Sequence, residues 1–208
     1  MMKITAVEKY KGSTYRIDFD EGESAYLNAE IINKFNLKAG LDLPLSAWEQ
    51  IRQESDFRRA RERALYLLDY KDYSYVDMFK KLRQNYDEEL CYRVMGKLVE
   101  MGAINDRRYA EGLARHYVEV KLFGRRRAFQ EMRLKGLTKE VIDIALAQYE
   151  DGADERIIVL IKKKFMRYLG DEKGVTRVKN SLIRYGYDYS EINRALREIE
   201  SESGEDGQ

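Results

Sequence analysis

The chain has 208 residues, enough to bury a hydrophobic core in one or two compact units. Its 38 basic and 37 acidic side chains leave a formal net charge of +1, so any attraction for a polyanion must come from local clusters. The single cysteine, Cys91, excludes a disulfide within the chain, and no apolar run is long enough for a membrane span or a signal peptide. We therefore expect a cytoplasmic protein without membrane contact. The charged content of 36% and the single proline favour a mainly α fold.

The N-terminal 45 residues follow a strand pattern. Tyr15, Ile17 and Phe19 alternate with polar residues, which is the period of a half-buried strand. Turn residues at 11–13 and 21–23 predict an antiparallel meander of three strands, at 4–10, 14–20 and 24–27. Asn28 suits the N-cap of a short helix that ends before Pro44. The sequence thus predicts a small β-rich N-terminal domain over residues 1–45.

Helical patterns follow from residue 46 onward. Ser46 and Glu49 have the spacing of a capping box, which predicts the start of a long helix that ends near Tyr70. Four arginines lie between residues 58 and 63 of this helix. Cys91 lies in a later helical run, where a small apolar residue would pack well.

An internal repeat with a period of 50 residues is the most informative feature. The matched pairs are Met132 and Leu182, Gly136 and Gly186, Leu137 and Tyr187, Ile142 and Ile192, Ala145 and Ala195, and Leu146 and Leu196. A looser copy precedes them, and a period near 50 indicates repeated helical units. We predict a linking helix and first three-helix repeat at 46–104, with the repeat itself from about residue 56, then repeats at 105–150 and 151–200. These would form an elongated curved array, with Thr138 and Asp188 as helix caps and a disordered acidic tail at 201–208.

No pattern in the sequence indicates catalysis. The only histidine, His116, has no Cys, Asp or Glu at metal-ligand spacing and is expected to be a partly exposed helix residue. Phosphate-binding glycine loops and the nucleophile motif GxSxG are absent. We therefore expect no enzymatic activity, no metal and no cofactor.

Basic clusters are the remaining candidates for a binding surface. One cluster lies on a predicted helix of the middle repeat and consists of Arg125, Arg126, Arg127, Arg133 and Lys135. A second consists of Lys162, Lys163, Lys164 and Arg167, and the arginines at 58–63 form a third. Guanidinium groups bind carboxylate and phosphate equally well, so a protein and a nucleic acid are both possible partners. The alternative is a solvated helix face without a partner.

The middle repeat resembles the RecX family of recombinase regulators. The segments that carry the resemblance are NDRRYA at 105–110, FGRRR at 123–127 and EMRLKGL at 131–137, in the family's order and spacing. Segments at 64–68 and 98–104 resemble the family's first repeat, and the likeness spans residues 56–200. The chain departs from the family at 70–74, where members often have Arg-Ser or Pro-Arg and this chain keeps only the serine.

The resemblance implies a partner rather than a substrate. RecX proteins bind the filament of the RecA recombinase on single-stranded DNA and limit its growth, its ATP hydrolysis and strand exchange. The resemblance makes Asp106, Arg108 and Tyr109 contact candidates beside the two basic clusters, while Gly124 and Gly136 would serve backbone geometry. We expect a monomer that regulates, and most simply inhibits, RecA, with single- or double-stranded DNA as a further partner. The alternatives are a sequence-nonspecific nucleic-acid-binding repeat protein and an adaptor of unrelated partners.

Overall fold

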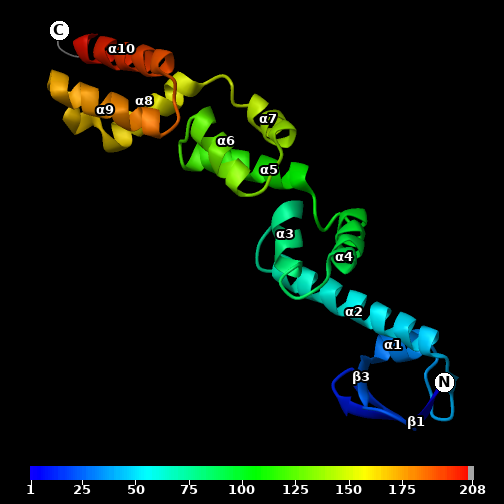
Figure 1. Cartoon of the computed structure of the whole chain (residues 1–208). Helices are drawn as coiled ribbons and strands as arrows, with labels where there is room; N and C mark the ends of the chain where they lie inside the picture. The colour runs from blue at the N-terminus through cyan, green and yellow to red at the C-terminus, as the bar shows by residue number, and fades with distance from the viewer. Residues whose placement is uncertain (206–208) are drawn as a thin grey trace. The chain divides into compact units, whose positions relative to one another are not determined.

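The computed structural model describes residues 1–205 and contains two compact units (Figure 1). The first unit comprises Met1–Lys71 and Phe79–Ala103, and the second comprises Asp72–Met78 and the chain from Ile104 onward. The predicted class, mainly α three-helix repeats with a small N-terminal sheet, is confirmed. The expected curved array of repeats stays a prediction, as do its boundaries at 46–104, 105–150 and 151–200.

The N-terminal sheet has four antiparallel strands in the order β3-β2-β1-β4. The predicted meander corresponds to β1 (Met2–Lys11), β2 (Thr14–Phe19) and β3 (Ala25–Asn28). A fourth strand, β4 (Asp42–Leu43), pairs with the start of β1 and was not predicted, because two residues are too few to show an alternation. Asn28 caps α1 (Ala29–Lys34) as predicted, and its Oδ1 accepts a 2.9 Å hydrogen bond from the amide of Glu30.

Helix α2 (Leu45–Leu68) covers the sheet's apolar face. Its Trp48 packs edge-on against Phe19, with ring centroids 4.9 Å apart. The predicted capping box at Ser46 is wrong, because the N-cap is Pro44 and makes no side-chain cap bond. Proline fixes a φ of −58° that already suits a helix start, and its carbonyl accepts from the amide of Trp48 at 3.1 Å.

The arginines of α2 are paired with carboxylates rather than gathered into an open basic surface. Arg58 donates to Glu30 at 2.8 Å and also pairs with Glu62, and Arg59 lies 3.6 Å from Asp56. These pairs neutralise much of the third basic cluster.

Two short helices follow, α3 (Tyr75–Leu82) and α4 (Glu88–Glu100). Asp87 caps α4 by accepting a 2.9 Å hydrogen bond from the amide of Leu90. Cys91 is fully buried in α4, as expected for a packing residue, and burial raises the pKa of its thiol.

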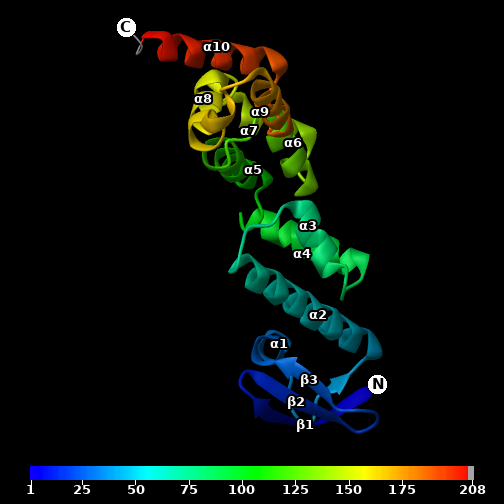
Figure 2. The same cartoon turned by 90° about the vertical axis from the view of Figure 1, so that its left-hand side faces the viewer.

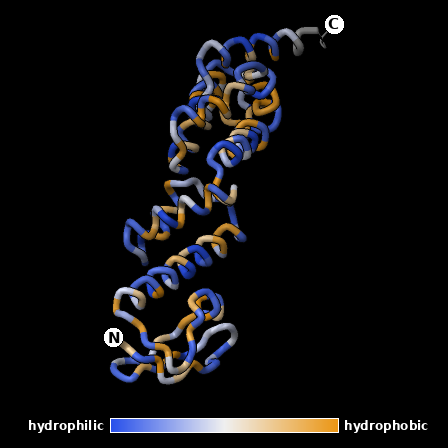
Figure 3. Tube along the Cα trace, turned by 90° about the vertical axis from the view of Figure 1, so that its right-hand side faces the viewer, coloured by the Kyte–Doolittle hydropathy of each residue, from blue (hydrophilic) through white to orange (hydrophobic). Residues whose placement is uncertain are grey.

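The second unit contains two groups of three helices. The first has α5 (Asp106–Arg115), which continues as the π-helical segment η1 (His116–Val120), then α6 (Arg125–Leu134) and α7 (Lys139–Ala147). The second has α8 (Ala153–Lys164), the 3₁₀ turn η2 (Met166–Tyr168), α9 (Glu172–Arg184) and α10 (Tyr189–Glu205). Each group encloses its own apolar core, and Figure 3 shows the mixture of apolar and polar residues along each helix that amphipathic helices require.

The 50-residue period of the sequence is a period of the fold. Every apolar residue of the six matched pairs is buried, and both matched glycines have positive φ, +78° at Gly136 and +95° at Gly186. Thr138 caps α7 as predicted, accepting from Val141 at 3.4 Å. At Asp188 the bond runs from its own amide to the Glu191 carboxylate at 2.7 Å, which is the other half of a capping box.

Helix α10 continues to Glu205, beyond the expected end of the third repeat at residue 200. The rest of the predicted disordered tail, residues 206–208, lies outside the described residues. Among residues 1–205, no helix combines the length and apolar content needed to cross a membrane. Among residues 1–201, whose side chains the structure describes, no three His, Cys, Asp or Glu side chains form a group that could hold a metal ion.

Candidate interaction surface

The three arginines that open α6 have different surroundings. Arg125 reaches α7, where its Nη2 donates to Asp143 Oδ1 at 2.8 Å. Arg126 is the most exposed of the three, with 69% of its side chain accessible, and its Nη1 lies 3.4 Å from Asp188 Oδ1. Arg127 is half-buried. Its guanidinium lies 4.0 Å from the ring centroid of Phe123 and donates to the carbonyl of Arg184 at 3.3 Å.

Arg127 therefore belongs to a junction between the two helix groups of the second unit. The amide of Gly124 donates to the carbonyl of Tyr185 at 2.8 Å, and the amide of Arg126 donates to the carbonyl of Gly186 at 3.3 Å. The turn between α9 and α10 thus caps the start of α6 with backbone carbonyls. A Cβ at Gly124 would lie 2.6 Å from the amide nitrogen of Tyr187, so only glycine permits this approach.

Tyr187 fixes the loop that leads into this junction. Its hydroxyl donates to the carbonyl of Leu122 at 3.1 Å, and Leu122 has a φ of +54°, which is unusual for a branched residue. Burial raises the pKa of Tyr187 to about 12, so the hydroxyl keeps the proton that it donates.

The lysine cluster lies at the C-terminal end of α8. Lys162, Lys163, Lys164 and Arg167 line a shallow hollow together with Met166, and no carboxylate lines it. Lys164 Nζ donates to the hydroxyl of Tyr185 at 2.9 Å, and the Arg167 guanidinium lies 4.8 Å from the ring of Tyr168. The helix dipole favours cations at this end of α8 even without a ligand.

The structure brings the arginine cluster and the lysine cluster together at Tyr185. From the arginine cluster, the guanidinium carbon of Arg127 lies 5.7 Å from the Tyr185 ring centroid. From the lysine cluster, the Nζ of Lys164 lies 5.4 Å from the same centroid. Tyr185 was not among the residues singled out from the sequence, although the Gly186 of the repeat beside it marks the turn. We call Arg126, Arg127, Lys164 and Tyr185 the Tyr185 cluster.

The other candidates lie elsewhere in the second unit. Arg133 donates to the carbonyl of Leu137 at 2.8 Å and so holds the turn between α6 and α7. Lys135 is half-buried at the C-cap of α6. Leu134 between them is 79% exposed. These residues are not among the contacts of the Tyr185 cluster.

The three candidates at the start of α5 differ in burial. Asp106 Oδ1 accepts from the amide of Tyr75 at 2.8 Å, and burial raises the pKa of this carboxyl. Tyr109 packs against the apolar core, and burial, followed by nearby Tyr117, raises the pKa of its hydroxyl. Arg108 is exposed.

A groove between α5 and α7 was missed by sequence reasoning. Arg107, Glu111 and Arg115 line it from α5, and the 62% exposed Ile144 lines it from α7. His116, which follows Arg115 and begins η1, is exposed as expected. The signal for the groove is the i, i+4, i+8 spacing of the three charged residues on α5.

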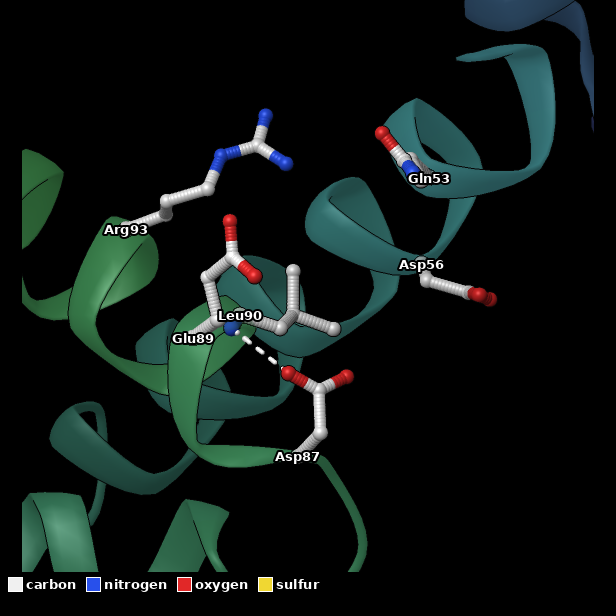
Figure 4. Close-up of a pocket in the computed structure, with 6 residues that line it drawn as sticks. All are labelled: Gln53, Asp56, Asp87, Glu89, Leu90 and Arg93. Carbon is white, nitrogen blue, oxygen red and sulfur yellow. Dashed lines mark hydrogen bonds between the residues drawn. The ribbon is translucent and has the colours of Figure 1, made fainter. Parts of the chain in front are cut away.

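A groove in the first unit is mainly acidic, in contrast to the basic clusters of the second unit. Figure 4 shows it between α2, which contributes Gln53 and Asp56, and α4, which contributes Glu89, Leu90 and Arg93 together with its N-cap Asp87. Three carboxylates and one guanidinium make it a poor site for phosphate.

Comparison with known proteins agrees with the fold and with the repeat. Residues 105–146 match the family model described as RecX, second three-helix domain. Two relatives are each named Regulatory protein RecX. That of Streptococcus sanguinis (strain SK36) is 26% identical over 212 residues, covering 100% of this chain and 81% of the relative. That of Clostridioides difficile (strain 630) is 24% identical over 201 residues, covering 94% and 95%.

Two solved structures are similar to the chain. A crystal structure of regulatory protein RecX has a TM-score of 0.76 and 26% identity, and the match covers 95% of this chain and 100% of that one. The structure of RecX from Lactobacillus salivarius has a TM-score of 0.65 and 26% identity, with coverage of 70% and 97%. The shared name of the relatives supports a regulatory role. The resemblance to the RecX family is confirmed, most specifically at residues 105–146, which match its second three-helix domain.

Proposed function

We propose that this chain regulates the RecA recombinase by binding the RecA filament on single-stranded DNA and limiting its growth, ATP hydrolysis and strand exchange. It would act in the cytoplasm as a monomer, without catalytic activity and without a cofactor. The observation that carries the proposal is the Tyr185 cluster, in a chain whose relatives are regulatory proteins. In this cluster, basic residues of α6 and of α8, which are far apart in sequence, lie around one tyrosine ring.

The mixed charge of this region supports a protein partner. Arg125 and Arg126 keep carboxylates within 2.8 Å and 3.4 Å, so a partner must compete with Asp143 and Asp188 for them. A phosphate backbone would be repelled by these aspartates, whereas a protein surface can offer basic groups to the aspartates and acidic groups to the arginines. Exposed Leu134 and Ile144 add apolar contact area in the same unit.

The second candidate function is sequence-nonspecific nucleic-acid binding. The hollow of Lys162, Lys163, Lys164 and Arg167 favours it, because no carboxylate lines that hollow. Salt separates the two functions. A site dominated by phosphate contacts loses affinity steeply as salt rises, while a protein interface keeps its preference for the filament over bare single-stranded DNA.

The test is ATP hydrolysis by the cognate RecA on single-stranded DNA with increasing amounts of this chain. Arg126→Glu reverses an exposed charge that makes no core contact, and Arg197→Glu on α10 makes the same change outside the Tyr185 cluster. We expect inhibition by the wild type and by Arg197→Glu. Arg126→Glu should need about tenfold more protein, the effect of roughly 1.4 kcal/mol at one charged contact.

Either of two results would remove the proposal. The first is unchanged hydrolysis at saturating wild-type protein. The second is equal binding of the filament and of bare DNA with a steep loss of both in salt, which would establish the nucleic-acid-binding function instead.

A further inference from the structure

Strand β3 is an open edge of the N-terminal sheet. In the order β3-β2-β1-β4 it has a neighbour on one side only. Figure 2 shows it on the side of the sheet nearest α1 and α2. An edge strand presents backbone donors and acceptors to any extended segment that reaches it, and proteins usually cover or shorten such edges. Here the strand is short, with four residues, but a groove lies along it.

The register shows which backbone groups are on offer. Ala29 donates to the carbonyl of Ser13 at 2.7 Å, and the ladder continues with Tyr15 opposite Leu27 and Arg16 opposite Tyr26. Hydrogen-bonded and non-hydrogen-bonded pairs alternate in an antiparallel ladder. Leu27 therefore bonds to β2, while the N–H and C=O of Tyr26 point to the open edge.

The groove beside this edge has a basic rim. Ala25, Tyr26 and Leu27 form its strand side, and α2 forms its other side with Trp48, Arg52, Ser55, Asp56 and Arg59. Arg52 is exposed, and its side chain makes no hydrogen bond or ion pair to other described residues. Arg59 lies 3.6 Å from Asp56, which leaves the positive charge of Arg52 unbalanced.

We infer that β3 accepts an extended segment of the partner protein as a fifth strand. The segment pairs with the backbone of Tyr26 and places an acidic side chain against Arg52. Backbone pairing supplies the affinity, as in other cases of strand addition, and the charge of Arg52 adds specificity. The inference rests on the proposed function, because it takes the RecA filament as the source of the segment.

Two variants of one residue isolate the backbone contact. Tyr26→Pro removes the N–H that faces the open edge and leaves the bonds to β2 intact, a position where an edge strand tolerates proline. Tyr26→Thr removes the same ring but keeps the N–H and a good strand former. Arg52→Glu tests the charge, with Arg197→Glu as the control.

The assay is binding of the full-length chain to RecA filaments on single-stranded DNA, by fluorescence anisotropy, with hydrogen exchange of the β3 amides. We expect about fivefold weaker binding for Tyr26→Pro, the effect of one lost hydrogen bond, and little change for Tyr26→Thr. Arg52→Glu should weaken binding by about tenfold, and exchange at Tyr26 should slow when filament is added.

The inference is overturned if wild type and Tyr26→Pro bind the filament equally and exchange at Tyr26 does not change. In that case the proposed function stands, because wild-type binding is intact. Slower exchange caused by bare DNA, or by concentrating the chain alone, assigns the edge to nucleic acid or to a second copy and also overturns it. If the wild type does not bind the filament at all, the proposed function fails first and the inference falls with it.

Discussion

The junction between α6 and the turn before α10 gives the sharpest prediction about stability. Replacing Gly124 by alanine would place a Cβ 2.6 Å from the amide nitrogen of Tyr187, so the turn must move. The move weakens two backbone hydrogen bonds, from Gly124 to Tyr185 and from Arg126 to Gly186. Overpacking costs about 1–3 kcal/mol and each of the two weakened hydrogen bonds about 1 kcal/mol, so we expect Gly124→Ala to lower the free energy of unfolding by roughly 3–5 kcal/mol.

The matched control is Gly112→Ala in the same unit. Gly112 lies within α5, and a Cβ there would meet nothing within 4 Å. Alanine at this position should raise the free energy of unfolding by about 0.5–1 kcal/mol, because it restricts the unfolded chain and favours the helix. The pair thus predicts changes of opposite sign from the same substitution.

Urea unfolding followed by circular dichroism measures both changes. The only tryptophan, Trp48, lies in the first unit, so its fluorescence reports on that unit as an internal control. If Gly124→Ala stabilises the chain as Gly112→Ala does, the close approach of Gly124 to the turn is wrong, and so is the arrangement of the Tyr185 cluster built on it.

Three further predictions concern single side chains. Tyr187→Phe leaves the Leu122 carbonyl without its donor and should lower the free energy of unfolding by about 1–2 kcal/mol in the same urea titration; an unchanged midpoint would contradict the bond. Because the folded pKa of Tyr187 is raised to about 12 from 10.0, its stabilising effect is present below pH 10 and lost as pH rises through 12; alkaline melts should show a smaller loss in Tyr187→Phe. Asp106→Asn keeps an acceptor for the Tyr75 amide and removes a charge that burial disfavours, so its stability should stay within about 0.5 kcal/mol of wild type, whereas Asp106→Ala should lose about 1 kcal/mol; equal losses would show that the charge matters.

The sequence predicts most of the fold because local patterns determine it. The alternation around Ile17 marks a strand buried on one face, and the 50-residue period marks equivalent buried positions in two helix groups. The start of α2 was misplaced because the spacing of Ser46 and Glu49 satisfies a capping box whether or not the bond forms. The helix begins after Pro44 because the fixed φ of proline suits a helix start, without any side-chain cap bond. A pattern of capping side chains therefore does not indicate this start.

The candidate surface could be predicted only in part, because it depends on contacts between distant segments. The basic runs at 125–127 and 162–164 are visible in the sequence, but nothing there shows that both reach Tyr185. Nor does a run of like charges reveal its partners. Arg125 pairs with Asp143, 18 residues further along the chain, and Arg126 with Asp188, 62 residues further along.

Within the second unit, the repeat also relates two contacts made by the turns at its glycines. The turn at Gly136 packs against Ser74, just before α3, and the turn at Gly186 packs against Gly124, just before α6. Both partners of the second contact lie 50 residues after those of the first. The contacts differ in closeness, since a Cβ at Gly136 would lie 3.0 Å from Ser74 Oγ, whereas the backbones meet directly at Gly124. The side chain of Ser74 thus acts as a spacer in the first contact, and its absence at Gly124 lets the turn cap α6 and bring Tyr185 between the two basic clusters.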